Sequence, residues 1–275
     1  MRAFIANTDF EWYRFLSGRA DLDELNFWRP SGAVFKVLAP GEPLLFRLKT
    51  PYNAIAGLGF FVHFSVLPAS LAWAAFGVKN GAVSEADMRA RIESYRRRRG
   101  QGEELVDHKI GCIILAEPTF FPQPDWIPQP RDWRPQTEVG RREDLTQGEE
   151  LHPRLGQGAF RIVVTDIYDR RCAVTGERTL PVLEAAHIKP YADGGAHAVT
   201  NGLLLRSDLH TLFDRGYLTV TPGYRLEVSR RIREQYENGR DYYALSGREL
   251  RPPRSESARP DPELLDWHNR HRYLG

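Results

Sequence analysis

Two histidines and one asparagine in the second half of the chain have side chains suited to acid–base chemistry. His187 ends a strand-like run, Asn201 closes the polar loop that follows, and His210 lies in the next helical segment. A neutral imidazole near pH 7 can take a proton from water, and an imidazole nitrogen can also bind a divalent cation. An asparagine amide both donates and accepts hydrogen bonds, so it can tie the loop to the strand. This set of groups suits metal-assisted hydrolysis.

The sequence around these residues predicts a helix, a strand, a loop, a second helix and a hairpin. A helix with one apolar face begins near Phe160, and the strand-like run ends in EAAHIKP. The loop after it contains the glycine pair 194–195. We expect SDLHTLFDRG to form a helix that is capped by Ser207 and ends at Gly216. The apolar runs that follow should form a hairpin that turns at 222–223.

The ordered set His187, Asn201 and His210, with CAVTG upstream and HTLFDRG downstream, resembles the HNH nuclease family. The similar part runs from about Phe160 to Ser229. The resemblance implies a ββα-metal fold in which His187 is the general base, Asn201 positions it, and His210 binds a single divalent metal, Mg²⁺ or Mn²⁺. A phosphodiester resists hydrolysis because water is a poor nucleophile and the leaving alkoxide is unstable. A base and a cation are what this reaction needs.

Asp214 is a second candidate ligand for the metal. It follows His210 by one helical turn, so both side chains should lie on the same face of the helix. That spacing permits Asp214 to bind the same metal; alternatively, its carboxylate ties down the turn at 215–216. Many family members carry an acidic residue or a histidine directly before the base, where this sequence has Ala186.

Glu184 could take the place of that missing ligand. Strict alternation along a strand puts Glu184 and His187 on opposite faces, so Glu184 would need a β-bulge at 185–186. The loop residue His197 is expected to be exposed rather than to bind metal. The predicted ligand set is therefore His210, Asp214 and Glu184.

The composition is that of a globular protein with about two domains. The chain has 275 residues, of which 41% are hydrophobic, and its net charge of +2 means that a polyanion would have to be held by local clusters. Cys112 and Cys172 lack the spacing of paired zinc motifs, so we predict no structural zinc and a reducing, cytoplasmic location. Charges near the N-terminus argue against secretion. The charge-free stretch 50–78 contains prolines and glycines, which favour a buried core over a membrane span.

The first third of the chain predicts strands with a few helices. Two apolar runs within 33–50 are separated by a Pro- and Gly-containing turn at 40–43, which predicts a hairpin. The stretch around Phe60 should form a strand, and ASLAWAAFG a short helix. Ser84 and Asp87 have the spacing of a capping box for the next helix.

Polarity and glycine content predict a linker between two domains. Residues 136–158 are polar and glycine-punctuated, so we expect a recognition domain at 1–135 and a nuclease domain with a C-terminal tail at 159–275. The first domain, with the segments NFWRPSG, PGEPLLFRLK, IAGLGFF and AWAAFGVKNGA, resembles the PUA-like superfamily, which includes EVE, ASCH and SRA-type readers of modified bases. The resemblances imply an α+β chain, with an N-terminal PUA-like β-barrel and flanking helices, and a C-terminal ββα-metal domain.

A reader of a modified base in a duplex can flip the base into a pocket with aromatic walls and a few polar groups. The candidate pocket residues are Trp28, Tyr52, Asn53, Trp73 and Asn80. Trp73 has an alternative place in the apolar core.

A cluster of cations could contact DNA phosphates, although such a run is also typical of a solvated helix end, where cations favour the helix dipole. The candidate residues for DNA-backbone contacts are Arg96, Arg97, Arg98, Arg99 and Lys189.

The pairing of such a reader with an HNH domain is typical of modification-dependent restriction endonucleases. It implies that the substrate is double-stranded DNA with modified cytosine and that the role is defence against phage. Two alternatives remain open: the first domain senses another feature, such as a phosphorothioate or RNA, or the protein is a catalytically inactive DNA-binding protein, in keeping with Ala186. Double-strand cleavage is compatible with a homodimer and with monomers that nick in turn.

Overall fold

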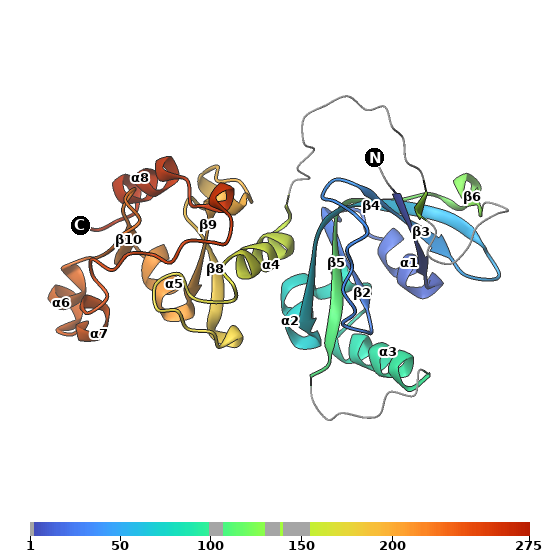
Figure 1. Cartoon of the computed structure of the whole chain (residues 1–275), viewed down its shortest axis with the longest axis horizontal. Coiled ribbons are helices and arrows are strands. Elements are labelled where there is room, and N and C mark those ends of the chain that lie inside the picture. The colour runs from blue at the N-terminus through green and yellow to red at the C-terminus, as the bar shows by residue number, and fades with distance from the viewer. Residues whose placement is uncertain (1–2, 99–106, 130–137, 140–154) are drawn as a thin grey trace. The chain divides into compact units, whose positions relative to one another are not determined.

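The computed structural model describes residues 3–98, 107–129, 138–139 and 155–275. It divides into an N-terminal unit, 1–159, and a C-terminal unit, 160–275. Each unit has its own sheet and core, and we describe each by itself (Figure 1).

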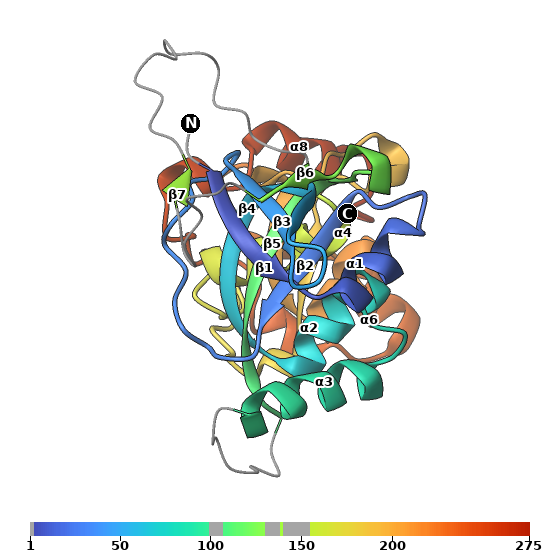
Figure 2. The ribbon, with the colours of Figure 1, turned by 90° about the vertical axis from the view of Figure 1, so that its right-hand side faces the viewer.

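A seven-stranded mixed sheet forms the frame of the N-terminal unit. Its strand order is β2-β5-β4-β3-β1-β7, and β6 pairs with β4 outside this path. Figure 2 shows the long strands side by side. The strands are β1 (Ala3–Thr8), β2 (Glu24–Arg29), β3 (Pro43–Leu48), β4 (Ala54–Pro68), β5 (Lys109–Phe120), β6 (Ile127–Pro128) and β7 (Glu138–Val139).

The sheet is curved but is not a closed barrel. Its edge strands β2 and β7 do not pair with each other in the described residues, which differs from the barrel that the sequence led us to expect. β1 and β3 run parallel, whereas the other pairs are antiparallel. The pairing of β4 with β5 shifts register near Leu58 and again near Phe61, and such irregularities bend a strand.

Three helices accompany the sheet: α1 (Phe10–Ser17), α2 (Ala69–Phe76) and α3 (Glu85–Arg98). α1 buries Trp12, Tyr13 and Leu16 in the core. The Trp12 ring meets Phe46 of β3 edge to face, with 5.3 Å between centroids. α3 begins as predicted, because the Asp87 amide donates to Ser84 Oγ and the Asp87 carboxylate accepts from a backbone amide just before the helix.

One predicted hairpin is wrong in its first half. Within 33–50 only β3 is a strand, while 33–38 is irregular, although Phe35 and Leu38 are buried. β3 already has a neighbour on each side, β1 and β4, so no edge is left for a hairpin partner. The apolar run therefore reflects core packing rather than a strand.

The charge-free stretch 50–78 forms β4 and α2, whose side chains contribute to the core. In the part of the chain that the structure describes, no helix is long and apolar enough to cross a membrane.

The C-terminal unit is built on a two-stranded sheet with a helix after it. β8 (Leu183–His187) pairs antiparallel with β9 (Gly202–Arg206), and α5 (Ser207–Asp214) follows directly. This is the predicted ββα arrangement. The other elements are α4 (Gln157–Ile167), β10 (Leu218–Val220), β11 (Leu226–Val228), α6 (Arg231–Tyr236), α7 (Arg240–Tyr243) and α8 (Pro262–His271). Short 3₁₀ turns lie at Gly77–Asn80 and Gln123–Asp125 in the N-terminal unit. In the C-terminal unit they lie at Leu180–Val182, Tyr191–Asp193, Val199–Asn201 and Glu256–Ala258.

The two ends of α5 differ in how well the sequence predicts them. Ser207 is the first residue of the helix rather than its cap, and the preceding Arg206 makes no side-chain cap. Arg206 instead donates to the Asp208 carboxylate in the first turn, at 2.6 and 2.8 Å. Gly216 ends the helix in a left-handed conformation (φ +76°), as expected of a glycine there.

α8 closes the C-terminal unit through two buried side chains. Leu265 is fully buried, and His268 is 2% exposed. The His268 ring stacks on Phe213 of α5 with 3.8 Å between centroids, and its Nδ1 lies 2.9 Å from Thr219 Oγ1. The helix thereby packs on both α5 and β10.

We predict that His268 makes the stability of the C-terminal unit fall in acid. Burial lowers the pKa of His268 to about 4, whereas an unfolded histidine titrates near 6.5. Unfolding between these values takes up a proton, so the stabilisation is complete above pH 6.5 and is lost as the pH falls through 4. In His268→Gln, the slope of unfolding free energy against pH should decrease by up to about 1.4 kcal/mol per pH unit. Urea unfolding followed through amide NMR signals of α8 measures this slope.

Thr219→Val is the matched control, because it removes the hydrogen bond and keeps the imidazole. It should lower stability at every pH with little change in slope. An unchanged slope in His268→Gln would contradict the assignment.

Candidate active site

His187 lies at the end of β8 in a half-buried position between aromatic rings. Its ring stacks on Phe160 of α4, with 3.9 Å between centroids and 14° between planes. Its Nε2 lies 2.9 Å from Nδ1 of His197. Burial lowers the pKa of His187 to about 4, and the neighbouring His197 and His210 lower it further in the same direction. The imidazole is therefore neutral at pH 7 and able to accept a proton.

Asn201 fixes the loop that joins β8 to β9. Its side chain is buried, and its Oδ1 accepts a hydrogen bond from the Lys189 amide at 2.8 Å. Its Nδ2 donates to the carbonyls of Lys189 and Ala196, at 2.9 and 2.8 Å. A Cβ at Gly195 would lie 1.9 Å from the Lys189 carbonyl oxygen, so this close crossing of the loop requires glycine. Asn201 thus ties the loop to the strand, which is the interaction that its amide allows.

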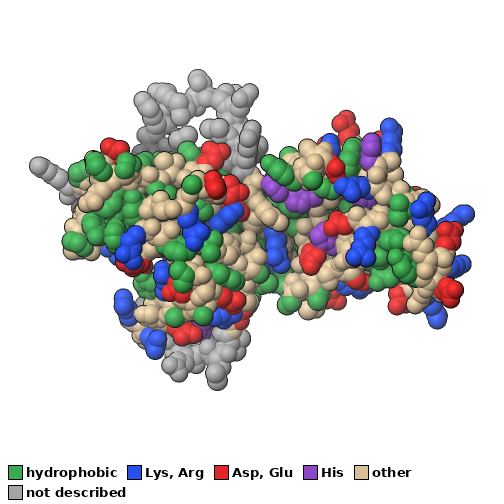
Figure 3. All heavy atoms as spheres, turned by 180° about the vertical axis from the view of Figure 1, so that it is seen from behind, with side chains coloured by type: hydrophobic (Ala, Val, Ile, Leu, Met, Phe, Trp, Pro, Cys, Tyr) green, Lys and Arg blue, Asp and Glu red, His purple; other side chains and the backbone are tan. Residues whose placement is uncertain are grey.

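His210 on α5 lies between two carboxylates. Its Nδ1 is 2.7 Å from Glu184 Oε2, and its Nε2 is 3.2 Å from Asp214 Oδ2. β8 pairs with β9 without a register shift, so Glu184 reaches His210 without the bulge that the sequence argument required. Histidine and acidic side chains lie close together on the face of this unit seen in Figure 3.

The electrostatics of the carboxylates differ from those of a simple surface ion pair. Burial raises the pKa of Asp214, an effect that His210 and Arg272 oppose and Glu184 reinforces. Two carboxylates on one imidazole concentrate negative charge there, whereas no carboxylate hydrogen-bonds His187 in the described residues. The two histidines therefore have opposite electrostatic settings.

HNH nucleases generally use a divalent metal, and His210 with Asp214 fits one. No group of three His, Cys, Asp or Glu side chains among the described residues could hold a metal ion by itself. Mg²⁺, however, usually keeps several waters and binds one or two protein ligands at 2.0–2.1 Å, so neighbouring ligands lie about 3 Å apart. The 3.2 Å between His210 Nε2 and Asp214 Oδ2 matches that spacing.

Glu184 faces the other nitrogen of the His210 ring. A carboxylate that accepts the Nδ1–H of a histidine leaves the lone pair on Nε2, which is the nitrogen that faces Asp214. This geometry favours Glu184 as an orienting partner of His210 over a direct ligand.

The N-terminal unit has a cavity of about 1090 Å³ beside β1 and β2. Aromatic side chains line it, among them Trp28 and Tyr95, whose rings meet edge to face at 6.1 Å. Lys49 and Arg98 lie over the Tyr95 ring at 5.6 and 6.0 Å from its centroid. Four lining side chains are basic and two acidic: Arg29, Lys49, Arg91, Arg98, Asp9 and Glu11. The cavity combines stacking surfaces with an excess of positive charge.

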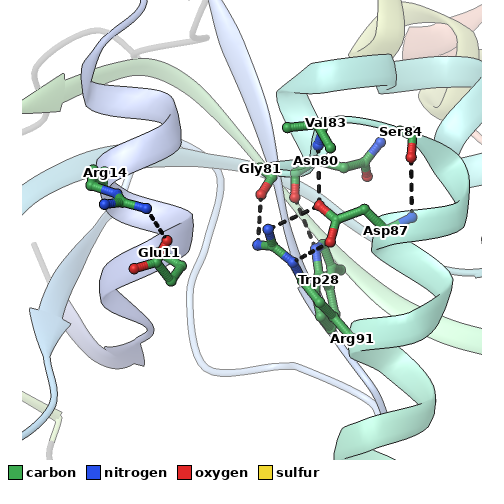
Figure 4. A network of polar contacts seen from close by, with 9 residues as sticks. All are labelled: Glu11, Arg14, Trp28, Asn80, Gly81, Val83, Ser84, Asp87 and Arg91. Carbon is green, nitrogen blue, oxygen red and sulfur yellow. Dashed lines mark hydrogen bonds and ion pairs between the residues drawn. The ribbon is translucent and has the colours of Figure 1, made fainter.

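Trp28 is held from behind by a buried polar network. Its Nε1 donates to the Asn80 carbonyl at 2.9 Å, and the buried Asn80 amide donates to the carbonyls of Ala72 and Gly77. Arg91 bonds the Gly81 carbonyl, next to Asn80. Figure 4 shows Trp28, Asn80 and Arg91 together. The indole edge therefore has a fixed direction.

Of the five predicted pocket residues, only Trp28 lines this cavity. Asn80 is fully buried behind it, and Trp73 is half-buried on α2. Tyr52 stacks on Phe10 at 4.5 Å and is 38% exposed. Asn53 accepts a hydrogen bond from Arg47 in the turn before β4.

The predicted DNA-contacting cations are distributed over both units. Arg98 lines the cavity, Arg97 is exposed and Arg96 is half-buried, while Arg99 lies outside the described residues. Lys189 lies in the C-terminal unit, with its Nζ 5.3 Å from the centre of the Trp267 ring on α8.

Sequence reasoning missed several residues at these sites. His197 was expected to be exposed, yet it is half-buried and contacts His187. The sequence predicted Phe160 only as part of an apolar helix face, and it did not single out Tyr95. The available signal for Tyr95 was its position beside the arginine run.

Comparisons with known proteins found one family model and several solved structures similar to parts of this chain. A family model described as HNH endonuclease (HNH_2) matches residues 172–221. Among solved structures, the modification-dependent TagI restriction endonuclease is 15% identical; the alignment covers 94% of this chain and 78% of that chain, with a TM-score of 0.34. ASCH from Zymomonas mobilis is 12% identical, over 42% of this chain and 67% of that chain, with a TM-score of 0.29. No curated protein matches the chain.

The matched segment contains β8, β9 and α5 with His187, Asn201 and His210. The C-terminal unit therefore contains an HNH endonuclease domain, and this domain places the protein among the nucleases. The predicted HNH domain and the mixed α+β fold are confirmed.

The two roles of the carboxylates can be separated by Glu184→Gln and Asp214→Asn. Glu184→Gln keeps a hydrogen-bond acceptor beside His210 Nδ1, so metal affinity should fall by roughly 10- to 100-fold and high Mn²⁺ should restore cleavage. Asp214→Asn removes the charge of the carboxylate that faces His210 Nε2, so it should lower metal affinity and cleavage more than Glu184→Gln does. Calorimetric titration with Mn²⁺ and cleavage assays at increasing Mn²⁺ measure the two effects. Equal losses in both variants, with no recovery, would contradict an orienting role for Glu184.

Proposed function

We propose that this protein is a modification-dependent DNA endonuclease. The C-terminal unit hydrolyses phosphodiester bonds with His187 as general base and one divalent metal, Mg²⁺ or Mn²⁺. The N-terminal unit recognises modified cytosine in double-stranded DNA. The single observation that carries the nuclease part is that the segment matched by the HNH endonuclease model has His187 at the end of β8 and the His210–Asp214 pair on α5 of one ββα unit.

The hydrolysis step assigns a task to each side chain. His187 takes a proton from water as the water oxygen forms its bond to phosphorus and the bond from phosphorus to the leaving oxygen breaks. Asn201 holds the loop so that the His187 ring keeps its direction. His210 and Asp214 would hold the metal. When bound, a divalent cation supplies charge neutralisation for the phosphoryl and leaving oxygens.

The low pKa of His187 affects its availability and its strength as a base in opposite ways. A group with a pKa of about 4 is almost wholly unprotonated at pH 7, so the ring is available to take a proton, but it is a weaker base than a histidine that titrates near 7. Its protonated form readily passes the proton on to solvent. No carboxylate hydrogen-bonds His187 in the described residues, so we assign protonation of the leaving oxygen to water.

The cavity of the N-terminal unit supports recognition of an extrahelical base. Flipping a base costs a few kcal/mol, and stacking on aromatic rings returns about 1–3 kcal/mol for each base. Trp28 and Tyr95 offer such rings, and the cations around Tyr95 suit the phosphates on either side of the flipped nucleotide. The volume of about 1090 Å³ is ample for a base with a substituent.

We predict that His187→Ala abolishes cleavage and leaves DNA binding intact. Loss of a general base lowers a rate by about 10²- to 10⁴-fold, while phosphate contacts elsewhere remain. Cleavage of plasmid carrying 5-methyl- or 5-hydroxymethylcytosine, with Mg²⁺ or Mn²⁺, gives the rate, and a mobility-shift assay gives the affinity. Undiminished cutting by the variant would reject His187 as base. Absence of cutting by the unaltered protein would favour a DNA-binding protein without nuclease activity.

The recognition part predicts that Trp28→Ala reduces the preference for modified DNA. Loss of one stacking ring should cost about 1–3 kcal/mol of binding, hence roughly 5- to 150-fold in affinity for the modified duplex. Tyr52→Ala is the matched control, because Tyr52 is an aromatic residue outside the cavity. Competition binding with modified and unmodified duplexes measures both. Equal binding of the two duplexes by the unaltered protein would remove the reader assignment, and phosphorothioate or RNA competitors would test the other features.

A further inference from the structure

We propose that His197 is a positioning residue that fixes the tautomer of His187, an inference that rests on the proposed nuclease function. The contact is a hydrogen bond between two imidazoles, from His187 Nε2 to His197 Nδ1 at 2.9 Å. One nitrogen must donate and the other accept, so this bond couples the position of the His187 ring proton to the tautomer of His197.

The proposed role of His187 as a base requires it to be the donor in this hydrogen bond. The Nε2 atom of His187 hydrogen-bonds His197, and its Nδ1 atom makes no hydrogen bond within the described residues. Nδ1 is therefore the nitrogen that can face water. Nδ1 carries a lone pair only if the ring proton is on Nε2 and is donated to His197. With the reverse arrangement, Nδ1 would bear the proton and could not act as a base.

His197 is itself held in place. Its ring stacks on Tyr191 with 5.1 Å between centroids and 9° between planes. It also contacts Phe160, the ring on which His187 stacks, at 5.8 Å and 52°. The carbonyl of the preceding residue, Ala196, accepts from Asn201 Nδ2 at 2.8 Å. The same buried amide thus fixes the loop beside both histidines.

The partner of His187 has a chemical consequence. A carboxylate in that position would stabilise the protonated ring and raise the pKa of His187, whereas His197 changes that pKa in the opposite direction, as burial does. His197 therefore combines orientation with the low pKa that burial produces. His187 keeps its direction and remains unprotonated.

The test reads the tautomer directly in the full-length protein at pH 7.5. Long-range ¹H–¹⁵N NMR correlations distinguish protonated from unprotonated ring nitrogens. We expect His187 to be protonated at Nε2 and His197 to be unprotonated at Nδ1. A proton on His197 Nδ1, with His187 Nε2 unprotonated, would overturn the proposal. This readout needs no substrate and no metal, so it stands apart from any failure of the nuclease assignment.

Variants of His197 then link the tautomer to catalysis. His197→Phe keeps a ring against Tyr191 and Phe160 but has no acceptor, so kcat should fall by roughly 10- to 100-fold at unchanged DNA affinity. His197→Asn carries an acceptor oxygen at nearly the position of Nδ1 and should recover most of the rate. Equal losses in the Phe and Asn variants, or a full rate in the Phe variant, would show that the hydrogen bond has no part in catalysis.

Discussion

The buried amide of Asn201 is the constraint on which the C-terminal site depends. A two-stranded sheet has few backbone hydrogen bonds of its own, and the loop between its strands begins directly after His187. Asn201 satisfies both backbone groups of Lys189 and the carbonyl of Ala196 from one side chain. A smaller side chain would leave these part-buried groups without this partner, which costs up to about 1–3 kcal/mol for each group. The asparagine of the motif is thus structural and functional at once, because the shape of the loop determines the direction of the rings.

The two histidines of the site, His187 and His210, have different surroundings. His187 has aromatic and neutral neighbours, so its environment favours the unprotonated ring. His210 has a carboxylate oxygen beside each ring nitrogen, at 2.7 and 3.2 Å. β8 carries both Glu184, which contacts His210, and His187 itself, so one short strand contributes to the surroundings of both histidines. In the proposed mechanism, environment rather than residue type distinguishes His187 as the base from His210 as the metal ligand.

The sequence predicts the parts of this fold that local pattern controls. β4, α2, α3 and the ββα unit follow from apolar periodicity and from capping signals such as Ser84 with Asp87. The irregular segment 33–38 could not be predicted, because whether an apolar run becomes a strand depends on which sheet edge is free. Likewise, the contact of His197 with His187 depends on how the loop folds back, and no periodicity encodes that. Trp28 lies on β2, Lys49 directly after β3 and Tyr95 on α3, so only the assembled unit brings these three lining residues together.

The cavity is a candidate recognition site because of its local charge, although the net charge of the whole chain is nearly balanced. The chain as a whole carries only +2, so its general attraction for DNA is weak. Around Tyr95, however, Lys49 and Arg98 place two cations against one ring. Asp9 pairs with Lys49 at 2.5 Å, and Asp87 pairs with Arg91, another cation that lines the cavity, at 2.9 Å. These ion pairs restrain Lys49 and Arg91 and reduce non-specific attraction of DNA. In the proposed recognition, affinity depends on a base that stacks on an aromatic ring as well as on phosphate charge, and this stacking distinguishes a flipped nucleotide from the remainder of the duplex.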